Sequence, residues 1–194
     1  MVAAEVCLYW LPLGAGGRSV RWNGRVFERL VALREHRSPC DLYHAALTLT
    51  LAERRYVVEM APEWSGDGDR GVVRSGPVGL AWLGRSRWFR YEVRLWRDGT
   101  IPDLDEAVGG PMHLATDPAR LRRLFEAAPH VPAATWGRDE LGLGEMWNSN
   151  SVVSWLLAVS GHHVDTLAPP TGGRAPGWDA GLALARQSGA GSCA

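Results

Sequence analysis

Alternating apolar and polar positions predict several strands in the first half of the chain. The apolar run at residues 6–11 reads as a buried strand that ends at Pro12. Residues 41–51 alternate in their second half, and residues 56–62 follow after a short charged turn, so the two runs predict a β-hairpin that places Glu59 opposite Thr48. The period of two is clearest over residues 88–96, where Phe89, Tyr91, Val93 and Leu95 are predicted to face the core.

Helical spacing of apolar residues predicts four helices. The first spans residues 25–35 and the second begins at Asp117 with Pro118 in its first turn. The third begins at residues 148–149 and is capped at its far end by Gly161, and the fourth runs from Asp179 to about Arg186. Gly- and Ser-rich residues 188–194 are predicted to form a disordered tail. The fold class is therefore α+β: one domain over residues 1–187, with an antiparallel sheet packed against the third helix.

Composition narrows the function classes. The 194 residues carry 21 basic and 21 acidic side chains, so no global charge favours nucleic acid, and none is expected as a partner. Every basic residue is arginine, which suggests a GC-rich bacterial genome and excludes a lysine nucleophile. No signal peptide or transmembrane segment is predicted, and three cysteines without metal spacing favour a reducing cytoplasm. We predict no cofactor and no metal site; the pair His162-His163 with Asp165 lacks a third ligand.

Candidate chemistry centres on Ser149. Its position at a helix N-terminus offers backbone N–H groups and a positive helix dipole, which favour negative charge on a nucleophile or a substrate oxygen. A plain helix cap is the alternative interpretation. His44, at the mouth of the first hairpin strand, is a candidate general base or a structural histidine.

Three stretches together resemble the circularly permuted papain-like fold of lecithin retinol acyltransferase-like and NlpC-like proteins: Tyr43-His44, the strand at residues 56–62, and Asn148-Ser149-Asn150. In those families a histidine comes first, a polar partner lies on the next strand, and the nucleophilic cysteine follows in an Asn-Cys motif at a helix start. This chain has Ser149 in place of that cysteine.

The resemblance implies an enzyme that hydrolyses or transfers an acyl group at an amide, thioester or ester. Ser149 would be the nucleophile, His44 the base, and Glu59 the residue that orients His44, with Glu63 as the alternative orienter. A helix dipole cannot ionise a serine, so His44 would have to take the proton during attack. The substrate would be a small molecule, a peptide or a lipid, and the sequence leaves open which.

The missing cysteine supports a second hypothesis, a catalytically inactive papain-like domain that binds a ligand or a protein in the same cleft. Ten tryptophans in a chain of this length imply that several are partly exposed. The candidate contact residues surround the Ser149 helix start: Trp147, Asn148, Asn150, Arg174 and Trp178. The oligomeric state is left open.

Overall fold

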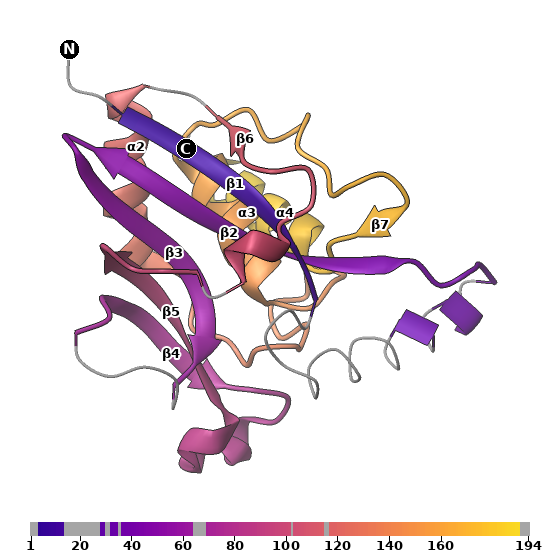
Figure 1. Ribbon diagram of the computed structural model, residues 1–194. Coiled ribbons are helices and arrows are strands. Elements are labelled where there is room, and N and C mark those ends of the chain that lie inside the picture. The colour runs from indigo at the N-terminus through magenta and orange to yellow at the C-terminus, as the bar shows by residue number, and fades with distance from the viewer. Residues whose placement is uncertain are drawn as a thin grey trace.

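The computed structural model describes residues 4–13, 28–29, 32–34, 36–63, 69–101, 103–114 and 117–190. In this part of the chain the fold is mixed α+β, with helices on one side of a sheet of largely antiparallel strands (Figure 1). Residues 28–29 and 32–34 are helical, and the rest of the helix predicted over residues 25–35 lies outside the described residues. None of the described helices combines the length and the apolar composition needed to cross a bilayer.

Seven strands form the described sheet, in the spatial order β4-β5-β3-β2-β1-β6, with β7 pairing in parallel with the start of β2. The strands are β1 (Ala4–Pro12), β2 (Asp41–Leu51), β3 (Arg54–Pro62), β4 (Val72–Pro77), β5 (Arg90–Arg97), β6 (Met112–His113) and β7 (Gly173–Arg174). The predicted strand at residues 6–11 and the predicted hairpin are confirmed. The predicted strand at 88–96 is confirmed from Arg90 onward.

The β2–β3 hairpin closes through a two-residue turn at Ala52 and Glu53. Both residues have positive φ, 50° and 66°, which is the backbone of a type I′ turn and matches the twist of the flanking strands. Leu51 therefore pairs with Arg54, and Thr48 pairs with Val57. The expectation that Thr48 would lie opposite Glu59 is wrong, because the turn is shorter than its sequence indicates.

Strand alternation divides the sheet into two apolar faces. One face contributes Leu8, Ala45, Leu47, Val58 and Val93 to the main core, which the helices cover. The opposite face holds a smaller cluster of Leu11, Ala46, Val57 and Ile101. The main core follows from burial of the apolar stripes of the helices against one face of the sheet.

In the described part of the chain, three helices cover the main core: α2 (Pro118–Ala127), α3 (Ser149–Val159) and α4 (Trp178–Ala190). Asp117 caps α2 as predicted, its carboxylate accepting from the Ala119 N–H at 2.8 Å. Gly161 ends α3 with φ +83°, also as predicted. Helix α4 packs against α3 at Gly181, where a Cβ would lie 2.1 Å from the Ser151 carbonyl oxygen. Its last residues, up to Ala190, extend into the stretch expected to be a disordered tail.

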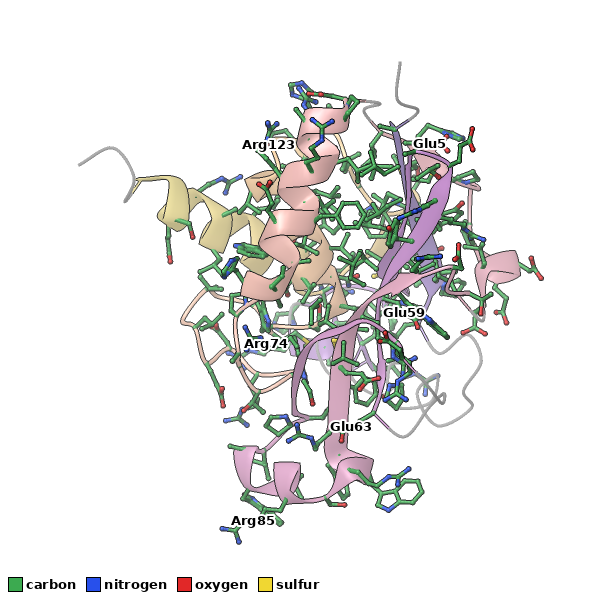
Figure 2. All side chains as sticks on the ribbon, turned by 90° about the vertical axis from the view of Figure 1, so that its left-hand side faces the viewer. Glu5, Glu59, Glu63, Arg74, Arg85 and Arg123 are labelled. Carbon is green, nitrogen blue, oxygen red and sulfur yellow. The ribbon has the colours of Figure 1, made fainter. Side chains whose placement is uncertain are left out.

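Short 3₁₀ helices complete the described chain: η1 (Ala81–Arg85), η2 (Arg87–Phe89), η3 (Leu104–Glu106) and η4 (Ala128–His130). The first two connect β4 to β5 and project at the lower end of the molecule, away from α2, α3 and α4 (Figure 2).

Candidate functional site

Side chains at the start of α3 satisfy two of its free backbone amides. The Asn148 side chain accepts from the N–H groups of Asn150 at 2.9 Å and Ser151 at 3.3 Å. In return the Asn148 N–H donates to the Ser151 hydroxyl at 3.1 Å, which completes a capping box. These amides are two of the donors that a bound anion or an oxyanion could use. Here the protein itself already uses them.

A loop from the C-terminal region lies directly over the start of α3. The side-chain amides of Asn148 and Asn150 both donate to the Pro176 carbonyl oxygen, at 2.8 and 2.9 Å. The next residue, Gly177, has φ +88°, and a Cβ there would lie 2.7 Å from the Met146 carbonyl oxygen. Only glycine allows the loop to approach this closely. The helix start is therefore covered by chain.

Asn150 joins α3 to the open edge of β2. Its side-chain oxygen accepts from the Ala45 N–H at 2.7 Å, and its amide donates to the Tyr43 carbonyl oxygen at 3.0 Å. These groups lie where β2 has separated from β3, whose pairing with β2 begins only at Leu47. Because Asn150 is 2 % exposed, these bonds are shielded from water. Asn150 therefore bonds β2 backbone groups that no neighbouring strand reaches.

Ser149 and His44 are not brought together. Ser149 is half-buried at the first position of α3, and its side chain makes no hydrogen bond with any described residue. Tyr43 and Ala45 lie in the main core with α3. His44, between them, points to the opposite face of the sheet, the face of Ala46. No hydrogen bond links His44 to Ser149, Glu59 or Glu63 in the described part of the chain.

The partly buried His44 ring carries no observed acid or base partner. Loss of solvation lowers its pKa to about 4, so the ring is neutral at physiological pH. A catalytic histidine of the triad type instead has a carboxylate on one ring nitrogen and the nucleophile on the other. Burial without such partners is the environment of a structural histidine.

The two candidate orienters belong to separate ion pairs. Glu59 meets the buried Arg94 guanidinium at 3.3 Å, and Arg94 also donates to Glu92 at 2.8 Å. Burial raises the pKa of Glu59, and the charge of Arg94 opposes that rise. Glu63 pairs with Arg90, whose hydrogen bond lowers the pKa of the Glu63 carboxyl. Each carboxylate is thus engaged by an arginine.

The predicted contact residues are largely internal. Trp147 is 1 % exposed and Trp178 is 7 % exposed, and Trp178 packs on Trp10 with ring centroids 4.9 Å apart. Arg174, half-buried in β7, lies alongside Leu42. Asn148 is also half-buried. The two tryptophans are therefore core residues in this structure.

A half-open pocket of about 310 Å³ lies at the β6 edge of the sheet, away from the start of α3. Its lining includes His113, Arg120, His162 and His163. The Ser160 hydroxyl donates to the Leu156 carbonyl oxygen at 2.6 Å, so it accepts from His162 Nδ1 at 2.9 Å. This fixes the proton of His162 on Nδ1 and leaves Nε2 buried without a described partner.

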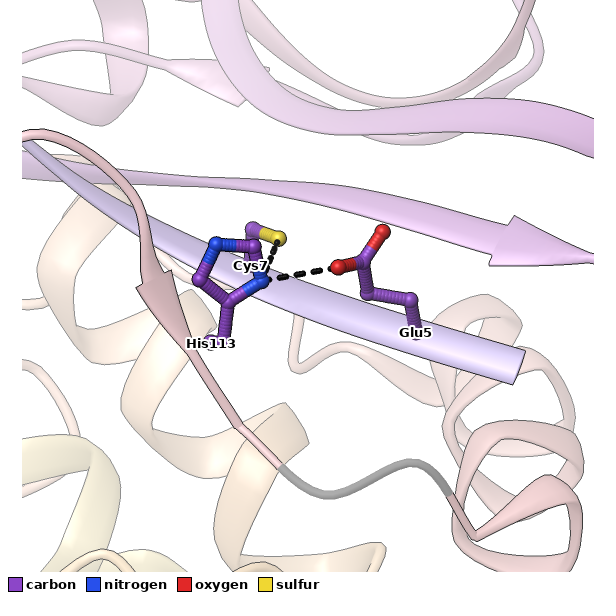
Figure 3. Close-up of side chains that lie close together, drawn as sticks. All are labelled: Glu5, Cys7 and His113. Carbon is purple, nitrogen blue, oxygen red and sulfur yellow. Dashed lines mark hydrogen bonds and ion pairs between the residues drawn. The ribbon is translucent and has the colours of Figure 1, made fainter. Parts of the chain in front are cut away.

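Three potential metal ligands meet on β1 and β6 (Figure 3). His113 Nδ1 lies 2.7 Å from Glu5 Oε1 and 3.5 Å from Cys7 Sγ. The three ligand atoms all lie within 4.8 Å of one another. Burial raises the pKa of the Cys7 thiol, and the Glu5 charge raises it further. The sequence offered a signal only in the alternation Glu5-Val6-Cys7, since His113 is distant in the chain.

The connection between β4 and β5, residues 78–90, exposes large apolar side chains; we call it the tip. It contains half of the large hydrophobic residues exposed in the described chain: Leu80 (44 %), Trp82 (67 %), Trp88 (65 %) and Phe89 (47 %). Phe89 was predicted to face the core and does not, because it lies in η2, before β5 begins. The alternation that predicted its burial starts only at Arg90.

Comparisons with family models, with curated proteins and with solved structures find no match. The described residues contain three notable features: an α3 start that is covered by the chain itself, a close group of potential metal ligands, and an exposed aromatic tip.

Proposed function

We propose that this chain is a binding domain whose tip docks on an anionic membrane surface. The observation that carries the proposal is the grouping of Leu80, Trp82, Trp88 and Phe89 in one projecting segment. An exposed apolar group of this kind is typical of an interaction site. As in the second hypothesis from the sequence, the domain would be non-catalytic, but its contact surface would be the tip and not the surroundings of Ser149.

Backbone hydrogen bonds hold the tip, and with it these side chains, in a defined position. Val78 N–H donates to the Phe89 carbonyl oxygen at 2.9 Å, and Gly79 N–H donates to the Trp136 carbonyl oxygen at 2.9 Å. Gly84 packs against Pro77, where a Cβ would lie 2.9 Å from the proline ring. Trp136 itself is 1 % exposed, so the tip is attached to the core. The exposed aromatics therefore have a rigid base.

Charge favours an anionic partner. From Arg70 to Tyr91 the chain carries five arginines and no acidic residue. Arg70 pairs with Glu92, Arg90 pairs with Glu63, and Arg74 donates to the Val131 carbonyl oxygen at 2.7 Å. Arg85 and Arg87 form no ion pair with any described carboxylate; Arg87 lies over the Trp88 ring at 5.7 Å. These two cations stand beside the aromatics.

Tryptophan and arginine together match the boundary of a lipid bilayer. Tryptophan rings favour the headgroup region, and each arginine near an anionic surface contributes about 1 kcal/mol. A single-stranded nucleic acid is less well matched, because it needs a basic groove that follows its backbone. A protein partner needs a surface that encloses the projecting side chains, and it is one outcome of the test.

Vesicle co-sedimentation tests the proposal. We expect binding to vesicles of phosphatidylcholine with phosphatidylserine, and at least tenfold weaker binding to phosphatidylcholine alone. Trp82→Ser with Trp88→Ser should abolish sedimentation, and Arg85→Ala and Arg87→Ala should each weaken it about fivefold, the equivalent of about 1 kcal/mol. Leu141→Ser, at another exposed apolar residue, and Arg97→Ala, at another exposed arginine, are the matched controls.

Two results would contradict the proposal. One is failure of the wild-type chain to bind either kind of vesicle. The other is unchanged binding by the double tryptophan variant. If the wild type binds no vesicle and Trp82 and Trp88 instead mediate self-association in analytical ultracentrifugation, the tip is a protein interface and the membrane proposal fails.

The competing proposal remains acyl chemistry at Ser149 within a papain-like fold. It is supported by the half-buried position of Ser149 at a helix start and by its unused hydroxyl. It requires that His44 act on Ser149 from the other face of β2. Labelling of Ser149 by a fluorophosphonate, lost in Ser149→Ala and reduced in His44→Gln, would favour this enzyme; we expect no labelling.

A further inference from the structure

We propose that Glu5, Cys7 and His113 bind one divalent transition-metal ion, with Zn²⁺ as the best match, at the β1–β6 edge of the sheet. This site is separate from the tip and from Ser149. The inference rests on the convergence of three different ligand types on one point, from two strands that pair side by side (Figure 3).

Strand geometry explains the convergence. Glu5 and Cys7 are two residues apart on β1, so their side chains leave the same face of the sheet. Cys7 is the direct partner of His113 in the β1–β6 ladder. The Leu114 N–H donates to the Val6 carbonyl oxygen at 2.8 Å, which holds β6 in this register. The three ligands are therefore positioned by backbone pairing.

Hydrogen bonds already link the three side chains, since the Cys7 thiol also bonds to Glu5 and to Thr48. His113 Nδ1 faces both Glu5 Oε1 at 2.7 Å and Cys7 Sγ at 3.5 Å. A neutral ring gives its one Nδ1 proton to the nearer atom, Glu5 Oε1, so the longer contact with Cys7 Sγ brings the sulfur close without a strong bond of its own. A cation at the centre of the group would replace that proton and accept one electron pair each from the nitrogen, the oxygen and the sulfur.

A Cys-His-Glu catalytic triad is a poorer interpretation of the same residues. In a triad the nucleophile and the carboxylate lie on different ring nitrogens of the histidine. Here the thiol and the carboxylate share Nδ1, and no described residue bonds to Nε2. The geometry is that of ligands around a point, and not that of a proton relay.

The ligand set indicates the class of metal. Thiolate, imidazole and carboxylate together suit Zn²⁺, while Mg²⁺ and Ca²⁺ prefer oxygen ligands alone. Cys7 is 5 % exposed, whereas the side chains of Glu5 and His113 are 44 % and 64 % exposed. An ion can thus enter from solvent and hold water in a fourth position. On binding, the Cys7 thiol releases its proton to water, and the proton of the His113 ring resides on Nε2.

Cobalt substitution tests the site on the untagged chain. We expect one Co²⁺ per chain and a thiolate-to-cobalt charge-transfer band in the near ultraviolet, and we expect Zn²⁺ to displace the cobalt. Cys7→Ser should abolish the band. His113→Ala, at an exposed position, and Glu5→Gln should each weaken Co²⁺ binding at least tenfold. Cys40→Ser, Cys193→Ser and the exposed His163→Gln are matched controls that should leave the band unchanged.

The result that overturns the proposal is absence of a charge-transfer band in the folded wild type. A band that survives Cys7→Ser but is lost in Cys40→Ser or Cys193→Ser also overturns it, because the metal then lies elsewhere. His113→Ala keeps the test decisive if Cys7→Ser fails to fold, because the exposed ring can be removed without opening the core. Full binding by a folded His113→Ala chain contradicts the site.

Discussion

The start of α3 and the tip differ in how far their side chains are bonded to the rest of the protein. At α3, Asn148 and Asn150 together meet backbone groups of their own helix, of β2 and of the 173–177 loop. At the tip, the backbone is bonded internally while Trp82 and Arg85 face outward. A polar motif at a helix start can therefore serve to hold elements of the fold together. Side chains that make few contacts within the protein are the better candidates for binding a partner.

The largest expected effect is that of Asn150→Ala. The substitution leaves the buried Ala45 N–H and Tyr43 carbonyl oxygen without partners, at about 1–3 kcal/mol each, so we expect the free energy of unfolding to fall by about 3–5 kcal/mol. Urea denaturation measures the change. Asn150→Asp, which keeps an acceptor but buries a carboxylate against the Tyr43 and Pro176 carbonyl oxygens, should cost at least as much. If the free energy of unfolding fell by less than about 1 kcal/mol, Asn150 would not be important for holding α3 to β2.

His44 should make stability depend on pH. Its pKa falls from 6.5 to about 4 on folding, so between these values the unfolded chain binds more protons than the folded chain. Stability is therefore full above pH 6.5 and decreases as the pH falls toward 4, by about 1–2 kcal/mol after allowance for partial exposure. His44→Gln should flatten the urea midpoint against pH over this window relative to the exposed control His163→Gln. An unchanged slope would contradict the burial argument.

Two serines of the same helix turn should respond differently. Ser151 is fully buried, donates to the Met146 carbonyl oxygen at 3.0 Å and accepts from Asn148 N–H, so Ser151→Ala should destabilise the fold by about 1–2 kcal/mol. Ser149 makes no side-chain hydrogen bond in the described chain, and Ser149→Ala should cost only a few tenths of a kcal/mol. Thermal and urea unfolding of both variants measure the difference. Equal losses would mean that Ser149 is also a cap.

The smallest expected effect on stability is at the tip. Trp82→Ser with Trp88→Ser should change the free energy of unfolding by no more than about 0.5 kcal/mol per site, because both rings are about two-thirds exposed. The same pair should remove vesicle binding. A loss of several kcal/mol in urea denaturation would show that these rings stabilise the fold, which would count against the proposal.

Local signals in the sequence predicted most of the elements. Asp117-Pro118 correctly marked the start of α2, and Gly161 marked the end of α3, since caps depend on neighbouring residues alone. The hairpin was predicted but its register was two residues off. Ala52-Glu53 forms a turn that usually contains Asn or Gly, so its sequence gave no sign of the tight geometry.

The candidate sites depended on pairing that a local pattern does not contain. Glu5 and Cys7 meet His113 only because β6 pairs with β1, a contact between distant parts of the chain. His44 was expected near Ser149, yet the face of a strand on which a residue lies is set by register, and a shift of one residue reverses it. Exposure of Phe89 likewise followed from where β5 begins, at Arg90.

Amide hydrogen exchange with and without anionic vesicles tests the central claim most directly, because it reports on the tip and on the α3 start in one experiment. The account predicts slower exchange confined to residues 78–90, and no change at residues 145–151 or 173–178. Protection of the α3 start with an unprotected tip would contradict it, and would place the contact surface at the α3 start.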